Sequence, residues 1–218
     1  MNLQDFEINF REKVRSLDAG PDAKPKDAPD PAHDLSHFER VVATAKRLAQ
    51  TENAKLEVVI PAAWLHDFIV VPKNDPRRTQ ASRLSAEAAI EYLRSIDYPA
   101  EFYEDISHAI EAHSFSANIT ARTLEARIVQ DADRLDGIGA IGIARLFITA
   151  GLMRRPIYRS EDPFCKTTEP DDSIFTIDHI YKKLFVVAER LGTEAGRAEG
   201  AQRLAFLKIY LKELAREI

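Results

Sequence analysis

The sequence of 218 residues has only one cysteine, Cys165, so no disulfide bond can form within the chain. A single thiol fits a reducing compartment, and we therefore expect a cytoplasmic protein. No apolar stretch reaches the roughly 18 uncharged residues that a membrane-spanning helix needs, so we expect no membrane partner. The first residues lack the basic start and the apolar segment of a signal peptide, and we expect no secretory leader.

The chain also lacks an excess of basic residues. It has 30 lysines and arginines against 35 aspartates and glutamates, which gives a net charge of −5. Proteins that bind polymeric nucleic acid usually carry a basic excess, so we expect no such partner. A local basic pocket for a small phosphorylated ligand remains compatible with this balance.

Strand-like alternation of apolar and polar residues is missing over any useful length. Helical periodicity covers most of the chain instead, and we predict an all-α protein with a single domain over residues 1–218. We expect a mobile Pro-rich loop at about 19–31 and a long polar loop at 154–172. The predicted helices are Phe6 to Val14, one that starts near Asp34, and segments at about 56–67, 81–96, 99–113, 120–135, 138–152, 174–191 and 193–216.

Two adjacent residues, His66 and Asp67, end an apolar run that we expect to be a buried helix. His37 lies on a separate helical segment, and the aspartates Asp131 and Asp133 lie on a third. Two imidazoles and two carboxylates from three helices could close around one divalent metal ion, and mixed nitrogen and oxygen ligands suit a transition metal better than calcium. Spacing alone leaves an alternative, a buried histidine beside a helix-capping aspartate, because His and Asp also pair for structural reasons.

The segment from Gly137 to Gly142 matches the G-x-G-x-x-G fingerprint of dinucleotide-binding proteins. That fingerprint needs a preceding strand in a parallel sheet, whereas residues 124–130 favour a helix. We therefore do not expect a nicotinamide cofactor. We expect these glycines to let one helix approach its neighbour, or to break a helix just after the aspartate cluster.

Four blocks of the sequence follow one another in a characteristic order. They are His33–Val41, Ala63–Asp67, Glu111–Ser116 and Gln130–Asp136. Together they resemble the HD-domain superfamily of metal-dependent phosphohydrolases, and within it the bacterial YedJ/YpgQ-like branch. The resemblance implies an all-helical HD-type bundle with its core motifs at 33–136. It also implies hydrolysis of nucleoside triphosphates to monophosphate and pyrophosphate through a metal-activated water.

The resemblance further implies which side chains bind the metal. These ligands are His37, His66, Asp67 and Asp133. His33, one helical turn before His37, and Asp131, two residues before Asp133, are the alternatives. The ion could be manganese, iron, cobalt, nickel, zinc or magnesium, although magnesium usually avoids imidazole.

Three residues are candidates for the chemistry beside the metal. Asp67 could help to deprotonate the water, and Asp136, one turn after Asp133, could orient water or substrate. His113 could donate a proton or a hydrogen bond to a phosphate oxygen. The alternative for His113 is a histidine at a helix C-terminus, where the macrodipole favours it.

Phosphate recognition needs cations, and three of them flank the predicted ligands. These are Lys73, Arg83 and Arg134. A solvated surface charge is the alternative for each. The loop 154–172 carries Tyr158 and Phe164, which could stack on a base. We thus expect a small phosphorylated partner, a nucleotide; the alternatives are a nucleoside monophosphate phosphatase and a non-catalytic nucleotide or metal sensor. The oligomeric state is not predicted.

Overall fold

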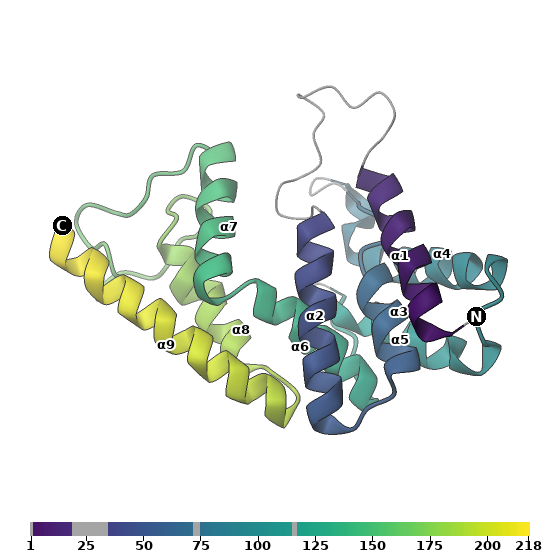
Figure 1. Ribbon diagram of the computed structural model, residues 1–218. Coiled ribbons are helices and arrows are strands. Elements are labelled where there is room, and N and C mark those ends of the chain that lie inside the picture. The colour runs from purple at the N-terminus through teal and green to yellow at the C-terminus, as the bar shows by residue number, and fades with distance from the viewer. Residues whose placement is uncertain (1, 19–34, 72–74, 115–116) are drawn as a thin grey trace. The chain divides into compact units, whose positions relative to one another are not determined.

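A computed structural model describes residues 2–18, 35–71, 75–114 and 117–218 of the protein (Figure 1). Across these ranges the regular elements are helices and no strand occurs, so the all-α prediction is confirmed. The predicted loop at 19–31 lies outside the described residues. The helices are α1 (Leu3–Asp18), α2 (Leu35–Glu52), α3 (Leu56–Leu65), α4 (Ala81–Ser95), α5 (Tyr103–His113), α6 (Leu124–Asp136), α7 (Gly139–Leu152), α8 (Phe185–Glu189) and α9 (Glu194–Glu217), with the 3₁₀ turns η1 (Pro76–Gln80) and η2 (Ala100–Phe102) and the π-helix η3 (Ile180–Leu184).

The chain divides into two compact units. The first comprises residues 1–133 and 192–195, and the second comprises residues 134–191 and 196–218. The boundary falls within α6, directly after Asp133. A single domain over the whole chain stays a prediction.

The first unit is built around α3. Helices α1, α2, α4 and α5 all pack against α3, and every side chain from residue 58 to residue 65 is buried. This arrangement explains why the apolar residues of α3 surround its axis instead of forming one stripe. Glu7 of α1 links the C-terminal end of α3 to α2. Its carboxylate accepts hydrogen bonds from Trp64 Nε1 of α3 at 3.2 Å and from Lys46 Nζ of α2 at 2.6 Å.

The second unit contains an error in the predicted helices. The helix expected at 174–191 begins only at residue 178, and residues 180–184 form a π-helix. The backbone N–H of Thr176 donates to the Pro156 carbonyl at 3.0 Å, and that of Ile177 donates to the Ile157 carbonyl at 2.9 Å. These two bonds tie residues 176–177 to a segment about 20 residues earlier in the chain, and helical structure begins directly after them.

The glycine pattern also lies in the second unit, and its context is helical on both sides, as predicted. Helix α6 ends just before it and α7 starts at Gly139, which has φ of +76°. Glycine adopts this left-handed conformation without steric cost. A Cβ atom on Gly142 would collide with the backbone carbonyl group of Gly137. The glycines therefore break the chain between two helices and let the turn close tightly.

No single helix in the described part of the chain is long and apolar enough to cross a membrane; α6 and α7 reach that length and composition only when counted together as a bent pair.

The loop at 154–172 is organised by a carboxylate that the sequence did not single out. Asp162 is 7% exposed and accepts hydrogen bonds from the backbone N–H groups of Lys166, Thr167 and Thr168 at 2.8–2.9 Å. These bonds, that of Thr167 foremost, hold the pKa of Asp162 well below its usual range. The loop is thus folded around one acidic side chain.

Replacing Asp162 with alanine should release this loop. We expect the amide protons of Lys166, Thr167 and Thr168 to exchange with solvent at least about tenfold faster, because each loses its acceptor. Hydrogen exchange followed by mass spectrometry measures this, with the neighbouring exposed Glu161→Ala as the control variant. Equal exchange rates in the two variants would show that Asp162 does not hold the loop.

Candidate metal centre

His66 and Asp67 lie in the turn directly after α3, so the helix predicted at 56–67 is two residues too long. His66 retains helical dihedral angles, φ −60° and ψ −39°, and its Nδ1 lies 2.9 Å from the carbonyl oxygen of Ala63. A carbonyl oxygen only accepts hydrogen bonds, so Nδ1 carries the proton and donates. The other ring nitrogen, Nε2, therefore presents a lone pair on the opposite side of the ring.

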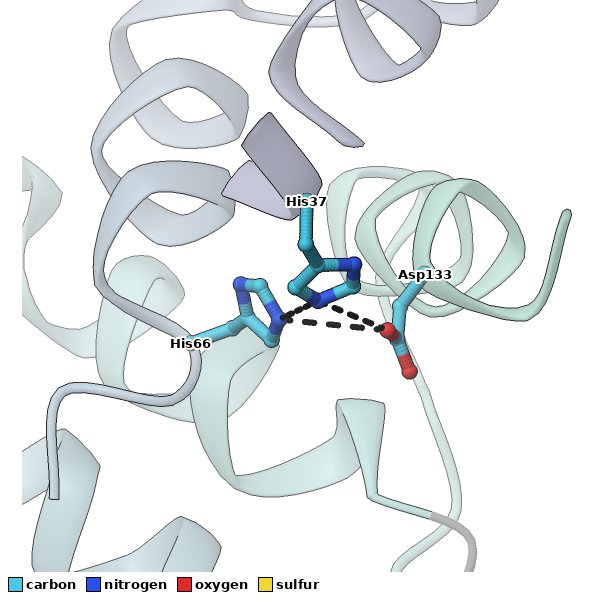
Figure 2. A group of neighbouring side chains, drawn as sticks. All are labelled: His37, His66 and Asp133. Atoms are coloured by element: carbon cyan, nitrogen blue, oxygen red, sulfur yellow. Dashed lines mark hydrogen bonds and ion pairs between the residues drawn. The ribbon is translucent and has the colours of Figure 1, made fainter. Parts of the chain in front are cut away.

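His37 from α2 and Asp133 from α6 face this lone pair (Figure 2). The Nε2 atoms of His37 and His66 lie 3.3 Å apart, and Asp133 Oδ1 lies 3.7 Å from the first and 3.8 Å from the second. The two imidazoles are 1% and 0% exposed, whereas the Asp133 side chain is 29% exposed. The group is therefore buried on its histidine side and open to solvent at the carboxylate.

Asp67 joins this group to a third histidine. Its Oδ2 lies 3.7 Å from His66 Nε2, and its Oδ1 lies 3.4 Å from Nε2 of His113, the last residue of α5. His113 is held by its own helix, because its Nδ1 donates to the Ile110 carbonyl at 2.6 Å. The segment after Asp67 is fixed as well, since the backbone N–H of Ile69 donates to Ser85 Oγ at 3.0 Å. Asp67 thus has one oxygen toward each histidine.

The two histidines beside Asp67 differ in protonation. Burial lowers the pKa of His66 to about 4 despite the opposing charges of Asp67 and Asp133, so its ring is neutral at pH 7. Burial also acts to lower the pKa of His113, but the hydrogen bonding and charge of Asp67 outweigh it and raise the pKa to about 8. His66 is therefore available as an electron-pair donor, and His113 holds a proton.

The donor set fits a transition-metal ion. Two groups, His37–His66–Asp133 and His66–Asp67–His113, each offer donor atoms within 4.8 Å of one another. Ligand atoms about 2.1 Å from a common tetrahedral ion lie about 3.4 Å apart, close to the spacings in the first group. Both groups need His66 Nε2, and one lone pair serves one ion. The geometry therefore suits a single ion, with nitrogen and oxygen ligands of the kind transition metals accept.

The two neighbouring aspartates of α6 have different surroundings. Asp133 has an oxygen within 4 Å of both histidines. Asp131 is fully buried and accepts hydrogen bonds from Gly192 N at 2.8 Å, Thr193 N at 2.8 Å and Thr193 Oγ1 at 2.7 Å. Its carboxylate therefore fastens α6 to the residues just before α9.

The remaining predicted site residues differ in their surroundings. Asp136 is buried and forms an ion pair with Arg145 of α7, and Arg134 donates from its guanidinium to the Arg190 carbonyl at 2.7 Å. Both belong to the second unit, and their predicted roles stay predictions. Arg83 has an exposed side chain in the first turn of α4. Lys73 and His33 lie outside the described residues.

No role was predicted for Gln130, which is 9% exposed. Its Nε2 donates to the Ala112 carbonyl of α5 at 2.6 Å. The available signal was its position three residues before Asp133, because a polar residue one turn from a predicted ligand lies on the same helix face.

Comparisons with known proteins show which family the chain belongs to. A model of the HD domain family matches residues 34–138. The protein YpgQ of Bacillus subtilis is 30% identical over 190 residues, 85% of this chain and 84% of YpgQ. The crystal structure of Bacillus subtilis YpgQ in complex with ADP has a TM-score of 0.73 and 29% identity, covering 97% of both chains. That of an HD-superfamily hydrolase from Bacillus thuringiensis has a TM-score of 0.73 and 25% identity, covering 98% of this chain and 97% of the other. The chain belongs to the HD domain family of metal-dependent phosphohydrolases.

Proposed function

We propose that this protein hydrolyses nucleoside triphosphates to monophosphate and pyrophosphate, using one divalent transition metal. The proposed ligands are His37, His66, Asp67 and Asp133. The observation that carries the proposal is the approach of three donor atoms, two imidazole nitrogens and one carboxylate oxygen, to within 3.8 Å of one another. A nucleotide is proposed as substrate because the related YpgQ was crystallised with ADP.

Each side chain has a distinct task in this proposal. The metal ion, when bound, lowers the pKa of a water molecule and offsets charge on the phosphoryl oxygens. Asp67 accepts the proton of the attacking water, since its carboxylate borders the donor group and is 27% exposed. His113 holds a proton at Nε2, directs Asp67 Oδ1 and can donate to a phosphate oxygen.

The open side of the group leaves room for a phosphate, whose repulsion by the two carboxylates a bound metal ion would offset. The exposed parts of the site are Asp67 and Asp133, at 27% and 29%, while the histidines behind them are buried. A phosphate can therefore approach from the carboxylate side without displacing the imidazoles. Attack at the phosphorus nearest the sugar would release pyrophosphate, whereas attack at the terminal phosphorus would release orthophosphate.

A nucleotide panel tests the proposal. The metal-stripped protein is supplied in turn with manganese, cobalt, nickel, zinc or magnesium and with mono-, di- or triphosphates. We expect monophosphate and pyrophosphate in equal amounts from triphosphates with at least one transition metal, and no turnover with chelator. Orthophosphate released from monophosphates would indicate a phosphatase instead. Nucleotide binding without turnover under every metal would indicate a sensor.

A further inference from the structure

The hydrogen bond of Gln130 lies at a point where α5 needs support. The last four carbonyl groups of a helix have no partner within it. In α5, His113 Nδ1 donates a hydrogen bond to the Ile110 carbonyl at 2.6 Å. Gln130 Nε2 donates to the Ala112 carbonyl, also at 2.6 Å. The backbone on the N-terminal side of His113 is therefore held by a side chain from a different helix.

This bond closes a ring of contacts around the candidate metal centre. Gln130 and Asp133 are one turn apart on α6, so they share a face. Asp133 reaches His66 at 3.8 Å, while Gln130 reaches the end of α5 that carries His113. His113 in turn lies 3.4 Å from Asp67, and Asp67 lies 3.7 Å from His66. These contacts thus fix α6, the end of α5 and the residues after α3 relative to one another.

We infer that Gln130 is a positioning residue, which sets the place of His113 relative to Asp67 and Asp133. The inference rests on the proposed function, in which Asp67 accepts the proton of the attacking water and His113 orients the Asp67 carboxylate. Gln130 acts through the Ala112 carbonyl. Without the amide donor, the last turn of α5 loses its link to α6, and His113 Nε2 is no longer held against Asp67 Oδ1.

A double-mutant cycle distinguishes this role from a general contribution to folding. Gln130→Met keeps the length of the side chain and removes the donor. We expect kcat to fall about tenfold with KM within about twofold, because a small displacement of a group beside the reacting atoms costs rate. In a His113→Ala background the same change should alter kcat by less than about twofold. An exposed glutamine of α2, Gln50, gives the matched control Gln50→Met.

A second readout does not depend on activity. The ring nitrogens of His113, observed by ¹⁵N NMR, should shift in Gln130→Met and stay in place in Gln50→Met. Gln130→Asn, whose amide is one methylene shorter, should shift them too and keeps a polar group in the core should the methionine variant fail to fold. A wild-type protein without turnover would defeat the proposed function, while the NMR signals would still decide the placement of His113. Unchanged signals, or an equal fall in kcat in both backgrounds, would overturn the role of Gln130.

Discussion

Replacing His66 with alanine should abolish metal binding and nucleotide hydrolysis together. His66 Nε2 belongs to both groups of donor atoms around the candidate centre, so its loss disrupts each of them. Loss of an outer partner of a metal ligand typically costs 10–100-fold, and we therefore expect a fall of more than about 100-fold for a direct ligand. Metal content after dialysis and steady-state kinetics measure the two effects.

The control for this variant is another histidine of the first unit. His108 of α5 accepts a hydrogen bond from the backbone N–H of Arg122 at 3.0 Å and has no part in either donor group. We expect His108→Ala to keep its metal and its activity. A His66→Ala protein that is folded, binds metal as the wild type does and turns over substrate would contradict the proposed site.

Substitution by asparagine should affect metal affinity at Asp133 and folding stability at Asp131. Asp133→Asn removes a carboxylate that lies near both histidines and is partly exposed. We expect its metal affinity to fall more than about 100-fold, with the free energy of unfolding of the metal-free protein changed by less than about 1 kcal/mol.

Asp131→Asn should instead damage the fold. The carboxylate is fully buried and accepts three hydrogen bonds from Gly192 and Thr193. The NH₂ group of an asparagine would face the N–H and O–H donors of Gly192 and Thr193 without an acceptor. We therefore expect the free energy of unfolding to fall by about 2 to 4 kcal/mol. Urea unfolding and metal titration on both variants form the test. A stable Asp131→Asn protein that has lost its metal would make Asp131 the ligand.

Helical periodicity predicted which segments of the first unit are helices, because these helices pack around one central helix, α3. The spacing in α1 predicted a buried face, and Phe6, Phe10 and Val14 are buried. The apolar composition of α3 predicted burial on most sides, and its side chains from residue 58 to residue 65 are buried. The order of the blocks around His37, His66 and Asp133 indicated the candidate centre, and the structure brings these side chains together.

Features that depend on distant hydrogen bonds were not predictable from local pattern. The helix before η3 starts late, after Thr176 and Ile177, whose backbone N–H groups bond to residues 156–157. The environment of Asp131 is set by Gly192 and Thr193, about 60 positions along the chain. The support from Gln130 likewise depends on a carbonyl of another helix. In each case the side chain or backbone group gives no sign of its partner in the neighbouring sequence.

Crystals soaked in manganese provide the most direct test of a single ion bound by His37, His66, Asp67 and Asp133. An anomalous difference map should show one strong peak, with bonds of about 2.0–2.2 Å to the histidine nitrogens and the carboxylate oxygens. A map without a peak among these four side chains, or with the ion held by other residues, would contradict it.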